Sequence, residues 1–135
     1  MKTRLLLSVL AIAISVAPQD KGKYTGFTQS STEHMINELE QPFEVRSVRG
    51  AITRNGGVRE PLRDVLVEIK IPGDYYKIRQ TKTDENGQFK INHIAPGTYR
   101  FKVTFDGFQS VVGTIVVSRK AARDTDIKIA MNLGV

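Results

Sequence analysis

Few side chains in this 135-residue sequence have the type and spacing that chemistry needs. Cysteine is absent, and the only two histidines are His34 and His93. A zinc hydrolase needs histidines and a carboxylate at helix or strand spacing, and neither histidine has such companions. The lack of cysteine excludes disulfides, thiolate metal sites and cysteine nucleophiles within this sequence. We therefore expect no metal site.

The segment Asp84-Glu85-Asn86-Gly87 is the nearest approach to a calcium loop. An EF-hand has glycine at position six and glutamate at position twelve. Counted from Asp84, the glycine is fourth and position twelve is Ala95. The same residues suit a type I turn, which favours Asp at its first position and Gly at its last. We interpret the segment as a turn.

Carboxylates offer the remaining route to an enzyme. Glu44, Glu60, Asp64 and Glu68 lie near one another in the sequence, but the pattern does not fix which faces they share. No Gly-x-Ser-x-Gly elbow and no phosphate-binding glycine loop occurs. We expect a protein that is not an enzyme and binds no cofactor, and an enzyme based on these carboxylates is the weaker alternative.

Residues 1–17 are predicted to be an export signal. Lys2 and Arg4 precede the apolar run Leu5–Val16, which ends in small residues. The run is shorter than the roughly 20 residues of a membrane-spanning helix. We predict an exported protein, periplasmic or secreted, with no stable membrane insertion after signal removal.

Charge gives little indication of a partner. Without Lys2 and Arg4, which belong to the predicted signal, the formal net charge falls from +6 to +4. The sequence contains no long run of like charges and no basic stripe with interleaved aromatics, so nucleic-acid binding is not expected.

Residues 18–42 are predicted to form a linker and one short helix, Ser30–Glu40. Ser30 and Glu33 have the capping-box spacing, and Pro42 ends the pattern. Three apolar residues then fall on one face: Met35, Ile36 and Leu39. This face is too small to hold a helix alone. The helix must dock on its own domain or on a partner chain.

From residue 43 to 135 the hydrophobic pattern has a period of two, which is typical of strands with one buried face. The expected fold is all-β, a seven-stranded Greek-key β-sandwich. The predicted strands are Val45–Thr53, Val65–Ile71, Tyr75–Thr83, Phe89–Ile91, Tyr99–Phe105, Val111–Val117 and Ile127–Leu133. Tyr75–Thr83 is polar and should be an edge. Val111–Val117 is apolar on both faces and should be central, or covered on both faces.

Turn residues divide these strands. The candidates for structural turn motifs are Asp84, Asn86, Gly87, Pro96, Gly97, Asp106 and Gly107. Gly87 and Gly97 are expected to need positive φ, and Asp106-Gly107 is a two-residue hairpin signal. Phe89 and Tyr99 are the first inward residues after their turns and can pack together across the sandwich.

Three segments occur together in one known family: Pro61–Val67, Thr83–Phe89 and Ala95–Tyr99. In this order they resemble the carboxypeptidase regulatory-like domain, and the resemblance extends from Val45 to Val135. It implies a transthyretin-like, or prealbumin-like, sandwich. In that family the domain usually accompanies a catalytic, transport or adhesion domain, and we expect here an exported bacterial form that stands alone.

Related folds suggest activities that this sequence does not match. Transthyretin-like hydrolases of hydroxyisourate end in Tyr-Arg-Gly-Ser, whereas this chain ends Asn132-Leu133-Gly134-Val135. Intradiol dioxygenases bind iron with two tyrosines and two histidines, and His34 and His93 are predicted to lie on a helix and in a turn. Neither activity is expected.

Two functions remain. The first is a non-catalytic module that mediates protein interaction or structural support, with a protein partner bound on the Val45–Thr53 side or on the helix Ser30–Glu40. The alternative is a carbohydrate-binding module that stacks sugars on exposed aromatics, Tyr75 and Tyr76. Edge-strand packing of these two tyrosines is the plainer interpretation, because sugar platforms often prefer tryptophan and this chain has none.

Overall fold

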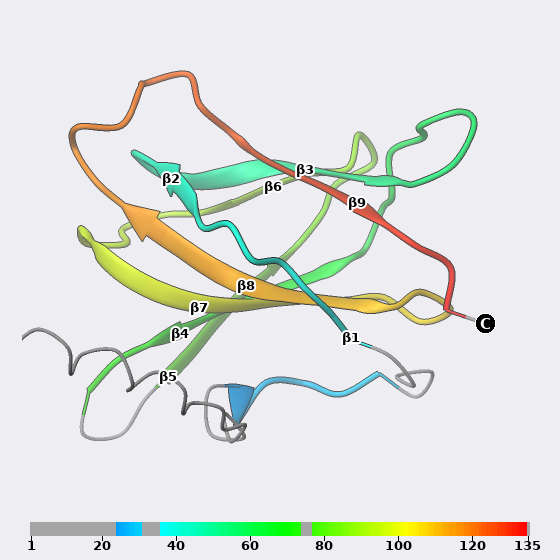
Figure 1. Ribbon diagram of the computed structural model, residues 1–135, viewed down its shortest axis with the longest axis horizontal. Helices are drawn as coiled ribbons and strands as arrows, with labels where there is room; N and C mark the ends of the chain where they lie inside the picture. Colours follow the sequence, from blue (N-terminus) through cyan, green and yellow to red (C-terminus); the bar gives the residue numbers. More distant parts are fainter. Residues whose placement is uncertain (1–23, 31–35, 74–76, 135) are drawn as a thin grey trace, which may run out of the picture.

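A computed structural model describes residues 24–30, 36–73 and 77–134, which form two β-sheets packed face to face (Figure 1). The strands are β1 (Ile36–Glu38), β2 (Phe43–Val45), β3 (Val48–Arg54), β4 (Leu66–Ile71), β5 (Lys77–Lys82), β6 (Gln88–Ile91), β7 (Gly97–Thr104), β8 (Ser110–Val117) and β9 (Ile127–Met131). No α-helix occurs among these described residues, and none of them forms a helix long and apolar enough to cross a membrane. The predicted all-β sandwich is confirmed.

Sheet A contains six strands in the order β1-β8-β7-β4-β5, and β2 pairs with β8 beside β1. The pairs β4–β5, β4–β7 and β7–β8 are antiparallel, whereas β1 and β2 run parallel to β8. β8 is therefore an interior strand and β5 is an edge, as the sequence predicts for these two segments.

Sheet B contains three strands in the order β6-β3-β9. β3 pairs antiparallel with β6 and parallel with β9, and Gly50 lies opposite Ile127. A Cβ atom on Gly50 would lie 1.9 Å from the backbone oxygen of Ile127. Only glycine fits this position, because any side chain would push β3 away from β9.

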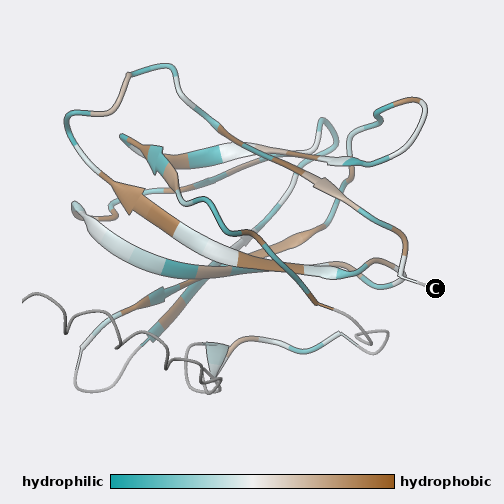
Figure 2. Cartoon of the chain, viewed as in Figure 1, coloured by the Kyte–Doolittle hydropathy of each residue, from teal (hydrophilic) through white to brown (hydrophobic). Residues whose placement is uncertain are grey.

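Apolar residues of both sheets meet between the two layers and recur along their strands (Figure 2). Ile52, Ile69 and Ile115 are fully or almost fully buried. Phe89 and Tyr99 also belong to this cluster, from sheet B and sheet A respectively. Because the chain has no cysteine, this packing joins the sheets without a disulfide.

The predicted count of seven strands is wrong, because the described residues form nine. The predicted strand Val45–Thr53 divides between the two sheets. Val45 ends β2 in sheet A and Val48 begins β3 in sheet B, and both are buried. The two residues between them are exposed and carry the chain across. β3 is also the middle strand of its sheet, so it offers no free edge to a partner.

The predicted helix Ser30–Glu40 is wrong over its described second half. Ile36–Glu38 is β1 and pairs with Ser110–Val112 of β8, and the Leu39 N–H donates to the Val112 carbonyl at 2.9 Å. Pairing satisfies backbone groups along β8 that a docked helix would leave open. Glu33 of the capping box and the predicted signal, residues 1–17, lie outside the described residues.

Replacing Gly50 with alanine should destabilise the sandwich by about 3 kcal/mol, because the new methyl group overlaps the Ile127 carbonyl. Urea unfolding measures the loss. The matched control is Gly57→Ala, whose Cβ would meet nothing within 4 Å, and which should change stability by less than about 0.5 kcal/mol. Equal stability of the two variants would show that β3 and β9 tolerate separation.

Candidate functional site

The outer face of sheet A is covered by residues 24–30, which we call the N-terminal arm. Thr28 anchors the arm on Glu68 of β4, whose side chain is only 2% exposed. The Thr28 N–H donates to Glu68 Oε1 and the Thr28 hydroxyl to Oε2, each at 3.0 Å. Phe27 is buried beside them. The arm therefore supplies hydrogen bonds to a carboxylate that is costly to bury without partners.

Other polar side chains lie buried on the same outer face. Lys102 of β7 is the cross-strand neighbour of Glu68 and is 3% exposed. Ser110 and Thr104 are also buried. These buried polar residues alternate with core residues along their strands. An alternating pattern usually indicates an outer face in contact with water, but here the outer face is covered. Sequence reasoning missed it because the covering residue is 40 positions from Glu68.

Lys70 lies at the border of the covered area. Its Nζ is 5.4 Å from the centre of the Phe27 ring, a cation–π contact. Burial lowers the pKa of Lys70 from its usual value, and the charge of Arg100 on the neighbouring strand lowers it further. The arm thus packs on the face through an aromatic contact as well as through Thr28.

The carboxylates considered for catalysis occupy different environments. Glu68 lies under the arm, whereas Glu60 and Asp64 are exposed and lie 3.7 and 3.9 Å from arginine nitrogens. Glu44 is exposed on β2. Within the described ranges, no three His, Asp or Glu residues gather where they could hold a metal ion.

The segment Asp84–Gly87 forms the turn before β6. Asp84 Oδ1 accepts hydrogen bonds from the N–H groups of Asn86 and Gln88, both at 2.9 Å. Gly87 has φ +74° and its N–H donates to the Asp84 carbonyl at 2.9 Å. The carboxylate is thus engaged in closing its own turn.

The Pro96-Gly97 turn leads into β7, which begins at Gly97, and both residues are exposed. Tyr99, two residues further on, donates its hydroxyl to the Ala95 carbonyl at 2.5 Å. Gly97 has φ +157°, so the predicted positive φ is confirmed. This tyrosine therefore ties the start of β7 to the loop before it.

Asp106-Gly107 forms the turn of the β7–β8 hairpin, closed by the hydrogen bond from Phe108 N to the Phe105 carbonyl at 3.0 Å. The turn also holds two distant segments. The Ser30 hydroxyl of the arm donates to Asp106 Oδ1 at 3.3 Å, and the Gly134 N–H donates to the Gly107 carbonyl at 2.8 Å. The sequence signal indicates the turn but not these contacts.

Tyr75 and Tyr76 lie outside the described residues, so carbohydrate binding on them stays a prediction. His34 lies outside them too. His93 is exposed in the β6–β7 loop, and its carbonyl accepts a hydrogen bond from the Arg79 guanidinium at 3.2 Å. His93 therefore joins no cluster of metal-ligating side chains among the described residues.

The outer face of sheet B contrasts with that of sheet A, because no described segment lies across it (Figure 1). Seven side chains alternate with the core residues of β3, β6 and β9 and form what we call the sheet B face: Arg49, Ala51, Thr53, Gln88, Lys90, Lys128 and Ala130. We take the sheet B face as the candidate site because no described segment covers it.

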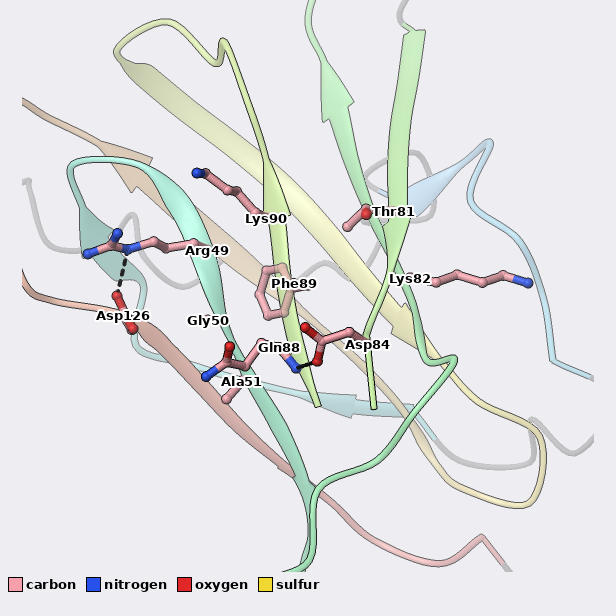
Figure 3. A pocket seen from close by; sticks show the side chains of 10 residues that line it. All are labelled: Arg49, Gly50, Ala51, Thr81, Lys82, Asp84, Gln88, Phe89, Lys90 and Asp126. Carbon is pink, nitrogen blue, oxygen red and sulfur yellow. Dashed lines mark hydrogen bonds and ion pairs between the residues drawn. The ribbon is translucent and has the colours of Figure 1, made fainter. Parts of the chain in front are cut away.

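A shallow hollow of about 510 Å³ opens where the sheet B face meets the edge strand β5 (Figure 3). Arg49 and Lys90 stand around it together with Asp84 and Asp126, whereas the side chain of Lys82 on β5 points away from them (Figure 3). Arg49 Nε lies 2.9 Å from Asp126 Oδ1, so this pair is neutralised. The hollow is wide and open to water, a shape that suits binding along a surface better than enclosure of a small substrate.

Three cations around the sheet B face lack a counter-ion among the described residues: Arg59, Lys90 and Lys128. All three are exposed. Sequence reasoning placed such residues on solvated strand surfaces, which agrees with their exposure. It could not show that cations from two strands and a loop meet on one side, since this depends on which strands pair.

Comparisons with known proteins identify the domain. The carboxypeptidase regulatory-like domain family matches residues 47–131, a range that begins after the arm, β1 and β2. No curated protein matches the chain. Among solved structures, 3-chlorocatechol 1,2-dioxygenase from Rhodococcus opacus is similar, with 16% identity and a TM-score of 0.44 over 75% of this chain and 68% of that one. This likeness assigns no chemistry to the present chain.

Substitution of Glu68 by glutamine should loosen the arm, because an amide cannot accept from Thr28 at both of its polar atoms. Hydrogen bonds to charged groups contribute about 1.5–3 kcal/mol, so hydrogen exchange at the Thr28 amide should accelerate by roughly one to two orders of magnitude. Glu44→Gln, on an exposed carboxylate of β2, is the matched control and should leave this amide protected. Unchanged exchange in the Glu68 variant would mean that another contact holds the arm.

Proposed function

The chain belongs to the carboxypeptidase regulatory-like domain family, and from this premise we propose that it is an exported, non-catalytic β-sandwich module that binds a protein partner in the cell envelope or outside the cell. The observation that carries the proposal is that the N-terminal arm covers the outer face of sheet A, whereas no described segment covers the outer face of sheet B. The partner surface is the sheet B face.

Because the N-terminal arm lies on the outer face of sheet A, a partner protein binds more easily on the sheet B face. The arm buries Phe27 and Glu68 on sheet A, so a partner could reach that face only by displacing hydrogen bonds already made. On the sheet B face, Ala51, Thr53 and Ala130 leave a recess between longer side chains. A partner there displaces only water, which is the less costly route to an interface.

The engagement of the carboxylates supports a non-catalytic role. Asp84 closes its own turn and Glu68 holds the arm. A general acid or base must reach a substrate proton, directly or through one water. Glu68 is buried and both of its oxygens are engaged by Thr28, Oδ1 of Asp84 is engaged in its turn, and the exposed Glu60 and Asp64 lie beside arginines.

Export is proposed from the sequence. The basic start, the apolar run and the small residues within positions 1–17 are typical of a cleaved secretory signal. Mass spectrometry of the protein from the envelope and culture medium of its host should give a chain that has lost this segment. A cytoplasmic chain that retains Met1 or Lys2 would overturn the export proposal.

A photo-crosslinking amino acid at Lys128, on the sheet B face, should yield a discrete adduct with one protein in the native host. The same amino acid at Lys120, an exposed position in the loop after β8, is the matched control and should yield none. Denaturing gels and mass spectrometry identify the adduct. Adducts of equal yield at both positions, or at neither, would refute the sheet B face as the partner surface.

A further inference from the structure

We propose that the sheet B face binds an acidic, extended segment of the protein partner, an inference that rests on the proposed function and adds the chemistry of the ligand. Its basis is the set of exposed cations around a floor of small side chains. Neither the family match nor the similar structure assigns such a site.

The strand register places the cations. Lys90 of β6 lies opposite Arg49 of β3, and Lys128 of β9 lies opposite Ala51 of β3. Neighbouring strands are about 4.8 Å apart and alternate residues about 6.7 Å apart. The Cα atoms of Lys90 and Lys128 are therefore separated by about 12 Å, on opposite sides of β3. An extended segment with carboxylates two to four residues apart spans a matching distance of about 7–13 Å.

The floor between these lysines is low. Ala51, Thr53 and Ala130 are half-buried and line a second hollow, of about 170 Å³, with Arg59 and Lys128 at its border. Small side chains allow the backbone of a ligand to approach the sheet while its side chains reach the cations. The cations flank this floor on both sides.

The nearby acids offset these cations only in part. Four positive charges (Arg49, Arg59, Lys90 and Lys128) face two negative ones (Asp84 and Asp126) around the two hollows. Asp126 is paired with Arg49, whereas Arg59, Lys90 and Lys128 make no ion pair with a described residue. The local charge is therefore positive, and it favours a ligand whose carboxylates complete the pairing.

The face lacks the platform that sugars and bases need. Its outward residues include no aromatic side chain, and Phe89, which lines the hollow, is 5% exposed. Recognition of bases and of many sugars uses stacking on exposed rings. An acidic polypeptide needs only the cations and access to the floor, so it fits the face better than a polysaccharide or nucleic acid.

Fluorescence anisotropy with two labelled ten-residue peptides tests the proposal, one alternating Glu with Ser and the other alternating Gln with Ser. The full mature chain should bind the Glu peptide and not the Gln peptide. The affinity should fall at least about tenfold between 50 and 300 mM salt, since exposed charges are screened over this range.

Two double variants of equal charge change separate a site from a general effect. Lys90→Glu with Lys128→Glu should weaken binding at least about tenfold, whereas Arg119→Glu with Lys120→Glu should weaken it less than about threefold. The altered residues are all exposed, and circular dichroism verifies folding. Equal losses in both variants, or equal binding of the two peptides, would overturn the proposal.

Competition with a sulfated oligosaccharide distinguishes the source of the negative charge. Stronger, lysine-dependent binding of the oligosaccharide would replace the peptide with a polysaccharide and overturn the inference. A partner crosslinked at Lys128 combined with no binding of the Glu peptide would refute the acidic segment while leaving the proposed function intact.

Discussion

The pair of hydrogen bonds from Thr28 to Glu68 decides how the two outer faces of this sandwich differ. A carboxylate that is 2% exposed on a strand needs donors, and the arm supplies both a backbone N–H and a hydroxyl at 3.0 Å. Holding those donors in place requires the arm to lie along sheet A. The same requirement buries Phe27 and occupies the part of sheet A around Glu68 and Lys70.

Residues 36–45 extend this constraint to the edge of sheet A. β1 and β2 pair in succession along β8 and occupy backbone groups that another chain could otherwise use. At the opposite edge, Lys77, Arg79 and Lys82 on β5 discourage pairing by their charge. The family match begins at residue 47, so much of the protection of sheet A comes from segments that precede the matched range.

Local chemistry explains why much of the fold was predictable. Alternation identified the segments of β4, β6, β7 and β9, and Asp84 with Gly87 identified a turn whose hydrogen bonds span only four residues. The count of strands and the helix failed because they depend on long-range pairing. Ile36 reads as part of a helical face, yet it lies opposite Ser110 on an edge that needs a partner. Alternation likewise predicted a wet face for Glu68 and could not reveal the arm.

The charge of the candidate site could not be predicted from the sequence either. A net charge of +6 does not predict where positive charge gathers, because the answer depends on which acids are already engaged. Asp126 lies beside Arg49, 77 positions away in the sequence, because β3 and β9 pair in parallel. That pairing removes one acid and one cation from the face together, while Lys90 and Lys128 remain uncompensated. The positive character of the sheet B face is therefore a consequence of topology, and changing these two lysines alters the field without disturbing the packed core beneath it.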